Sequence, residues 1–268
     1  MATCVENPCG QIHISIEDGV GRFVLDNPRK LNAMSISMWR TLISALDGLE
    51  RDPTLRCIVL TGTGDKAFCV GADISEMENN ALGADAAAEY DRIAKDGLHK
   101  LQAFSKPSIA MVSGYCLGAG LGLAVACDLR IASEESRFGV PAAKLGIGYY
   151  YAGVKRLTDL VGPSRAKQML FTAAQFSAAD MLRAGLIDEL LPARDLAAHV
   201  ESLAARIARN APLTIAAAKY AIETACSAPS ERDLETCAAL EHACMNSRDY
   251  AEGRRAFLEK RTPVFKGC

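Results

Sequence analysis

Two short runs of small residues constrain this chain more than any other feature of its sequence. They are residues 67–73 (AFCVGAD) and residues 114–120 (GYCLGAG). Each run is typical of a strand end that turns into a helix through small residues. Backbone N–H groups are then exposed at a helix N-terminus, where the helix dipole is positive. Two such amides aimed at one point form an oxyanion hole, which stabilises an enolate or a tetrahedral oxyanion.

The bulk composition indicates a folded protein with a sizeable core. The 268 residues suffice for one α/β domain with an appendage or for two small domains. Half of the residues are apolar, which argues against disorder. The net charge is −2 and neither sign dominates one half of the chain, so nucleic acid or an anionic membrane is not expected as the main partner. No apolar run reaches the ~18 residues of a transmembrane helix.

The N-terminus and the cysteines favour a cytoplasmic location. Residues 1–7 (MATCVEN) contain neither the basic nor the apolar stretch of a signal peptide. Ten cysteines are present, but none form a C-x-x-C pair and no spacing matches a zinc site. Cys57, Cys116 and Cys127 lie among apolar neighbours, like small buried hydrophobic residues. We therefore expect reduced thiols and no metal site.

Expected strands and helices alternate along the first half of the chain. Strands are expected at 12–16, 23–25, 57–62, 109–112 and 129–132. Helices are expected from Ser35, a plausible N-cap, to the Asp52-Pro53 pair, and then at 88–104 and 121–127. The run 57–62 is continuously apolar, as a strand covered on both faces requires. This order predicts an α/β fold with mostly parallel strand pairing.

From about residue 163 the composition shifts toward alanine and leucine. The last candidate strand is 187–191, and helices are expected at 193–209, 213–226, 231–247 and 250–260. A helical tail of this length behind a completed α/β core is typical of a chain that packs on a partner subunit.

Several segments, taken in order, resemble one known family. They are residues 31–35 (LNAMS), 68–74 (FCVGADI), 114–120 (GYCLGAG) with 127–129 (CDL), 138–141 (FGVP), 145–146 (LG) and 256–261 (AFLEKR). Together they resemble the crotonase superfamily, also called the enoyl-CoA hydratase/isomerase family. The matches span nearly the whole chain, and their combination is specific although each alone would be weak.

The resemblance implies a spiral of ββα units followed by a helical region that trimerises. We therefore expect an α/β core over residues 1–200 and a helical oligomerisation region over residues 201–268, in a homotrimer or a dimer of trimers. The implied substrate is an acyl-CoA thioester. Coenzyme A is then part of the substrate, and no tightly bound cofactor is expected.

The resemblance also implies the residues of the site. The two amides that hold the thioester carbonyl map to Ala72 and Ala119. The coenzyme A contacts map to Arg29, Lys30, Leu31, Ala33, Ala72, Asp73, Ile74, Phe257 and Lys260. Phe257 and Lys260 resemble tail residues that reach the nucleotide, often that of a neighbouring subunit.

The chain departs from the family's hydratases at their two catalytic glutamates, whose places hold Gly122 and Ala142. No acidic residue occurs in 117–127 or in 138–155, so a shift in alignment restores neither glutamate. Acid–base groups typically contribute 10²–10⁴-fold each to such a reaction. We therefore expect an enzyme that would be classed as an enoyl-CoA hydratase but has atypical or weak hydration activity.

Tyr149 is the remaining candidate for chemistry. Residues 145–149 (LGIGY) with Gly153 are similar to the family's methylmalonyl-CoA decarboxylases, which carry a tyrosine at this place but a histidine where this chain has Ala72. A phenol, with a pKa of ~10, is a poor base and a fair hydrogen-bond donor. Decarboxylation of a malonyl-type CoA is thus one alternative. A base-free isomerase, a thioesterase and a non-catalytic acyl-CoA-binding member, in which Tyr149 only lines the acyl pocket, are others.

Two polar residues have a plain structural interpretation. Asp73 is expected as a carboxylate at a helix start rather than an acid catalyst. His99 lies on an expected helix with Lys95 and Lys100 nearby, which favours a solvated face over catalysis.

Overall fold

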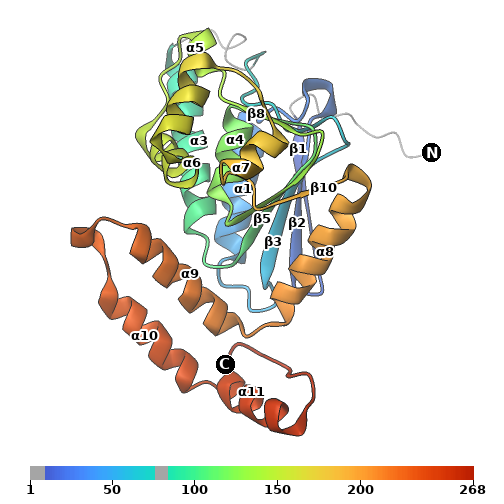
Figure 1. Cartoon of the computed structure of the whole chain (residues 1–268), viewed down its shortest axis with the longest axis vertical. Coiled ribbons are helices and arrows are strands. Elements are labelled where there is room, and N and C mark those ends of the chain that lie inside the picture. The colour runs from blue at the N-terminus through green and yellow to red at the C-terminus, as the bar shows by residue number, and fades with distance from the viewer. Residues whose placement is uncertain (1–9, 76–83) are drawn as a thin grey trace.

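The computed structural model describes residues 10–75 and 84–268, and its core contains two sheets (Figure 1). The larger sheet has the spatial order β1 (Gln11–Glu17), β2 (Val20–Asp26), β3 (Cys57–Gly62), β5 (Ser108–Val112), β7 (Leu129–Ser133) and β10 (Glu189–Leu191). The smaller sheet has the order β4 (Ala67–Cys69), β6 (Tyr115–Leu117), β8 (Arg137–Gly139) and β9 (Phe176–Ser177). Residues 1–7, in which the sequence analysis expected no signal peptide, lie outside the described residues, so that expectation stays a prediction.

The helices confirm the alternation expected from the sequence. Those of the core are the 3₁₀ helix η1 (Pro28–Lys30), α1 (Ile36–Leu49), α3 (Ala84–Ala103), α4 (Ala119–Ala126), α5 (Ala142–Leu145), α6 (Tyr151–Thr172), α7 (Ala178–Arg183) and α8 (Ala193–Arg209). The tail contains α9 (Pro212–Cys226), the 3₁₀ helix η2 (Pro229–Glu231), α10 (Leu234–Met245) and α11 (Arg248–Glu259). Ser35 caps α1 as expected, because its side chain accepts a hydrogen bond from the Met38 amide at 3.2 Å.

Strand pairing in the larger sheet is mostly parallel, as the sequence predicts. β1 and β2 form an antiparallel hairpin across a turn in which Asp18 and Gly19 both have positive φ. β2, β3, β5, β7 and β10 then pair in parallel. The β8–β9 pair in the smaller sheet is antiparallel.

The first four residues of β3 are apolar and buried, and helices cover both faces of the strand. Ile58 and Leu60 belong to the main core cluster, which includes α1 and α3. Cys57 and Val59 point the other way and pack against α8, which contributes Leu196, Val200 and Ala204 to a second cluster. Alternation of side chains across a strand divides its residues between the two clusters. The expected division between residues 200 and 201 falls inside α8, and the division into two regions stays a prediction.

The segment between residues 137 and 183 contains elements that the sequence analysis missed. These are the short strands β8 and β9, the short helices α5 and α7, and the helix α6. α6 consists of two helical stretches that meet at a kink at Gly162, whose backbone angles are not helical (φ 74°), next to Pro163, where a change in character was expected. Pro163 begins the second stretch, where proline is tolerated because the first residue of a helix donates no hydrogen bond within it.

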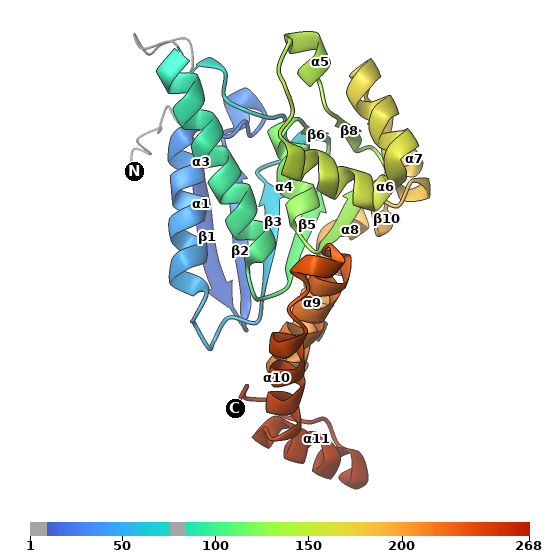
Figure 2. The same cartoon turned by 90° about the vertical axis from the view of Figure 1, so that its left-hand side faces the viewer.

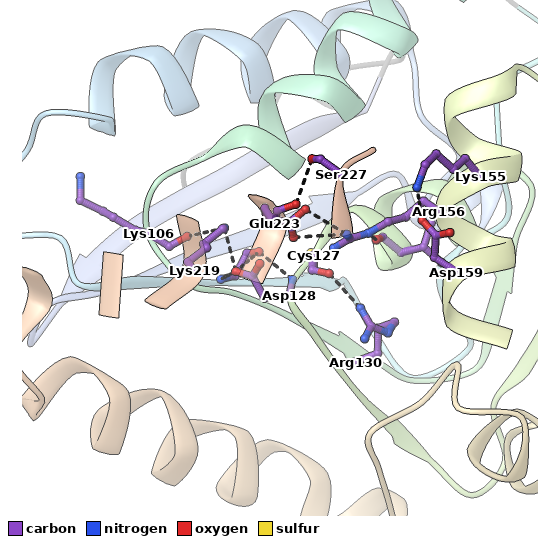
Figure 3. Close-up of polar contacts among 12 residues, drawn as sticks. Lys106, Cys127, Asp128, Arg130, Lys155, Arg156, Asp159, Lys219, Glu223 and Ser227 are labelled. Carbon is purple, nitrogen blue, oxygen red and sulfur yellow. Dashed lines mark hydrogen bonds and ion pairs between the residues drawn. The ribbon is translucent and has the colours of Figure 1, made fainter. Parts of the chain in front are cut away.

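The tail extends away from the sheets, and α11 lies at the opposite end of the molecule from α5 (Figures 1 and 2). Helix α9 is attached to the core by charged contacts (Figure 3). Lys219 donates to Asp128 at 2.8 Å and to the carbonyl of Lys106 at 3.1 Å. Arg156 of α6 pairs with Glu223 at 3.2 Å. None of the described helices combines the length and the hydrophobicity that a bilayer crossing requires.

Candidate active site

The first small-residue bend follows β4 and exposes the amide of Ala72. The Met34 amide donates to the Gly71 carbonyl at 2.8 Å, and the Asp73 amide donates to the Met34 carbonyl at 2.9 Å. These bonds hold the bend against residue 34 and leave the intervening amide unused, since Ala72 N–H has no hydrogen-bond partner among the described residues. Gly71 has a φ of 125°, which residues with a side chain rarely adopt.

The second bend joins β6 to α4 and exposes the amide of Ala119. The Gly118 amide donates to the Gly139 carbonyl at 3.0 Å, and Gly118 has a φ of 53°. Ala119 is the first residue of α4, so its N–H has no partner within the helix. Gly120 is required here because a Cβ at this residue would lie 2.1 Å from the carbonyl oxygen of Cys69.

The fold brings these two bends into contact. A Cβ built on Gly71 would lie 3.7 Å from the Ala119 nitrogen and 4.0 Å from the Gly118 Cα. Two amides that have no hydrogen-bond partner among the described residues, from bends about 47 residues apart in sequence, thus come from neighbouring backbone segments. Donors preorganised in this way can stabilise a developing negative charge, because they need no reorganisation during the reaction.

Asp73 supports the first bend from within the protein. Its side chain is 2% exposed and accepts two hydrogen bonds from Lys30 Nζ, at 2.7 and 2.9 Å. It also accepts from the Ser75 amide at 3.2 Å, which agrees with the expected carboxylate at a helix start. The Lys30 ammonium is therefore already paired, although its side chain keeps 37% exposure. This ion pair links η1, which contains Arg29 and Lys30, to the bend that carries Ala72.

The other residues expected to contact coenzyme A lie in two separate places. Leu31 and Ile74 are exposed near the first bend, whereas Ala33 is buried. Phe257 lies on α11 with 83% exposure, and Lys260 caps that helix. Because α11 is at the far end of the molecule, one chain does not bring Phe257 and Lys260 to its own bends (Figure 2).

Gly122 and Ala142 both lie beside the bends. A Cβ on Gly122 would lie 3.4 Å from Leu98 Cδ1 and 3.8 Å from the hydroxyl oxygen of Tyr149. Ala142 begins α5 directly after Pro141, whose Cδ lies 3.8 Å from the Cβ position of Gly118. The sequence analysis did not identify Leu98, because no sequence signal places a residue of α3 against one of α4.

Tyr149 packs beside Gly122 as a neutral phenol. Its ring centroid lies 5.7 Å from that of Tyr150, and the two rings are tilted by 34°. Burial, with smaller contributions from Tyr150 and Cys116, raises the pKa of Tyr149 well above its usual value. The hydroxyl has no hydrogen-bond partner in residues 10–75 and 84–268. Tyr149 can therefore donate a hydrogen bond to a ligand, and it is a poor base at neutral pH.

The cysteines near the bends are structural. Cys69 and Cys116 are fully buried, and Cys69 Sγ donates to the Gly71 carbonyl at 3.6 Å. Burial raises the pKa of Cys69 to about 12 and that of Cys116 well above its usual value. The thiolate is the nucleophilic form, so neither thiol is activated for nucleophilic chemistry.

Comparison with known proteins gives the family of this chain. The family model described as enoyl-CoA hydratase/isomerase matches residues 15–268. The crotonyl-CoA hydratase of Syntrophomonas wolfei is 34% identical, over 93% of this chain and 95% of that protein. The short-chain-enoyl-CoA hydratase of Clostridium acetobutylicum is 33% identical, over 91% of this chain and 93% of that protein.

Solved structures give the same result. A crystal structure of an enoyl-CoA hydratase from Bacillus anthracis superposes with a TM-score of 0.88 and 30% identity, covering 96% of this chain and 99% of that one. The α/β fold with C-terminal helices, expected from the sequence, is confirmed, and its strands form two sheets. The chain therefore belongs to the enoyl-CoA hydratase/isomerase family and is an acyl-CoA-processing enzyme with the crotonase fold.

Proposed function

We propose that the amides of Ala72 and Ala119 bind the carbonyl oxygen of an acyl-CoA thioester and stabilise the enolate that forms from it. The support is the contact between the two bends and the absence of protein partners for both amides among the described residues. Removing one donor of an oxyanion hole typically costs about 3–4 kcal/mol of transition-state stabilisation. Two amides together therefore supply a large part of the rate enhancement.

The reaction proposed for this site does not depend on a carboxylate base. The single observation that carries this is the Tyr149 hydroxyl 3.8 Å from the Cβ position of Gly122, where the family's hydratases have a glutamate. A neutral phenol donates a proton or a hydrogen bond but does not activate water. Hydration of enoyl-CoA is accordingly weak, because two acid–base groups worth 10²–10⁴-fold each are missing.

Decarboxylation of a malonyl-type CoA is the second candidate, and the same observation favours it. The C–C bond to the carboxylate breaks, CO₂ leaves, and the electron pair enters the thioester enolate held by Ala72 and Ala119. The Tyr149 hydroxyl then gives its proton to the α-carbon and recovers one from water. No step needs a general base, which agrees with Gly122 and Ala142 at the usual glutamate places.

Substrate assays on the wild type and two variants test this proposal. The assays are hydration of a series of enoyl-CoAs and CO₂ release from methylmalonyl-CoA. Tyr149→Phe is expected to lower turnover about 10²-fold with little change in KM, and Tyr151→Phe, at an 80% exposed neighbour, to leave it unchanged. Hydration at the rate of a glutamate-bearing relative would contradict the proposal. Binding without any turnover, unaffected by Tyr149→Phe, would instead indicate a non-catalytic acyl-CoA-binding protein.

The nucleotide part of coenzyme A is proposed to lie along Arg29, Lys30, Leu31, Ala33, Asp73 and Ile74. Phe257 and Lys260 contribute from a neighbouring subunit, because their helix lies far from the bends of its own chain. This arrangement requires an oligomer, which we propose to be a homotrimer or a dimer of trimers, as the resemblance implies. The helices α9, α10 and α11 form a concave apolar surface that encloses a volume of about 1090 Å³. This surface supports such an assembly. The cytoplasmic location and the lack of a tightly bound cofactor stay predictions.

A further inference from the structure

A cavity lies beside Gly122, between α3, α4 and α6. It has a volume of about 270 Å³. Its buried lining residues are Leu98 of α3, Gly122, Val125 and Ala126 of α4, and Gly153 of α6. Aliphatic walls of this kind suit methylene groups, because removing them from water is favourable by ~0.8 kcal/mol per CH₂.

The cavity begins close to the proposed oxyanion hole. Gly122 follows Ala119 by three residues on α4, which corresponds to a rise of ~4.5 Å along the helix. Gly122 has no side chain, and a Cβ there would reach both Leu98 in the cavity wall and the Tyr149 hydroxyl. Gly122 therefore belongs both to the wall of this cavity and to the surroundings of the Tyr149 hydroxyl. An acyl chain whose carbonyl is bound at Ala119 has the cavity within its reach.

Hydrogen-bond donors line the outer part of the same cavity. Lys95, His99 and Gln102 lie on one face of α3 at positions i, i+4 and i+7, and Arg156 reaches the cavity from α6. No aspartate or glutamate is among the described residues that line it. A ligand that extends to this end meets two cations, an imidazole and an amide.

Two of these four side chains are already engaged. Lys95 pairs with Asp91, and Arg156 pairs with Glu223 and donates to the Val125 carbonyl at 3.1 Å. His99 and Gln102, in contrast, have no hydrogen-bond partner in the part of the chain that the structure describes. A ligand can therefore engage these two side chains without breaking an existing hydrogen bond within the described residues.

We propose that this cavity binds the distal end of the acyl group and selects a terminal carboxylate, which makes the substrate class the CoA monothioesters of dicarboxylic acids. The apolar wall at Leu98 and Val125 holds the chain, and His99 and Gln102 bind the carboxylate beside Lys95 and Arg156. This assignment rests on the proposed function, since it places the thioester carbonyl at Ala72 and Ala119. It makes His99, which is exposed as the sequence analysis expected, a specificity-determining residue.

The test compares two ligands that differ only at the distal end, adipoyl-CoA and hexanoyl-CoA. Dissociation constants are measured by calorimetry on the wild type, on the His99→Ala/Gln102→Ala double variant and on Lys100→Ala. Lys100 is the control because it lies on the same helix but pairs with Asp47 of α1 and does not line the cavity. The wild type is expected to bind adipoyl-CoA at least about tenfold more tightly, which corresponds to about 1.4 kcal/mol.

The substitutions are expected to affect the affinities for the two ligands differently. The double variant loses about tenfold in affinity for adipoyl-CoA and keeps its affinity for hexanoyl-CoA, whereas Lys100→Ala changes neither. Equal wild-type binding of both ligands, or tighter binding of hexanoyl-CoA, overturns this inference and leaves the proposed function standing. If the protein binds neither ligand, both this inference and the proposed function are overturned. The wild-type comparison does not depend on the folding of any variant.

Discussion

At the scale of single residues, the absence of a side chain at residue 122 decides what chemistry the site can perform. Gly122→Glu restores a carboxylate beside Tyr149, and the nearest contact of the new Cβ, at 3.4 Å, is an ordinary one. Burial raises the pKa of such a carboxyl group toward neutral pH, where it can act as an acid or base. We predict a gain of at least about tenfold in the rate of enoyl-CoA hydration, measured by loss of the conjugated absorbance.

The control for this gain is Gly48→Glu, because Gly48 is exposed on α1 and no atom lies within 4 Å of its Cβ position. This control is expected to keep the wild-type rate. A wild type that already hydrates as fast as Gly122→Glu would show that the missing glutamate is not limiting.

The buried cysteines lead to a second prediction at the residue scale. Burial raises the pKa of Cys57, Cys69 and Cys127 to about 12, so at pH 8 only about one thiol in 10⁴ is the reactive thiolate. We predict that iodoacetamide at pH 8 labels the exposed Cys226 and Cys268 in the native protein and spares these three. Mass spectrometry of the digested protein gives the labelled sites. Because unfolding removes the burial, labelling in denaturant is expected at all of them.

At the scale of elements, Lys219 is the more buried of the two cations whose ion pairs attach α9 to the core. Lys219 is 12% exposed on its side chain and bonds both Asp128 and the Lys106 carbonyl (Figure 3). Asp128 also accepts from the amide and the hydroxyl of Ser108. Lys219→Ala leaves this carboxylate without its counter-charge, and we predict a loss of about 1–3 kcal/mol in the free energy of unfolding.

Lys155→Ala is the matched control for Lys219→Ala. Lys155 forms an i,i+4 pair with Asp159 in which both side chains are 46% exposed. Exposed pairs of this kind contribute ~0.3–0.5 kcal/mol. Urea unfolding curves that give the same change for both variants would contradict the anchoring role of Lys219.

Elements were predictable from the sequence where a single helix or strand carries its own pattern. The apolar run of β3 and the periodic face of α8 identify both elements, and α8 has the bounds that were expected. β8 and β9 were missed because each has two or three residues and is stabilised by pairing with distant strands. The two helical stretches of α6 were missed because the kink at which they meet depends on the local backbone at Gly162.

The site could be predicted only in part, for a related reason. The motifs indicate which amides are exposed, because glycine and alanine at a strand end leave the backbone bare. They do not determine that Gly71 lies against Ala119, or that Leu98 and Tyr149 flank Gly122, since these contacts depend on how whole elements pack. The cavity beyond Gly122 likewise arises from three helices, and none of their sequences indicates it alone.

At the scale of the whole molecule, the exposed apolar face of the tail predicts an oligomer. Leu234, Met245 and Phe257 line the concave surface of α9–α11 and are 67%, 54% and 83% exposed in the single chain. Large apolar patches of this kind mark association surfaces. We predict a trimer or hexamer by light scattering with size-exclusion chromatography, and a shift toward monomer in Leu234→Glu/Met245→Glu. Phe171→Glu, at a 75% exposed residue of α6, is the control.

The central claim is that two backbone amides bind one oxygen of the ligand. The most direct measurement is a crystal structure of the protein with a non-reactive acyl-CoA analogue. Our account predicts the thioester oxygen at 2.7–3.1 Å from both the Ala72 and the Ala119 nitrogens, the usual range for an oxyanion hole. A thioester oxygen bound elsewhere, or in contact with only one of these nitrogens, would contradict it.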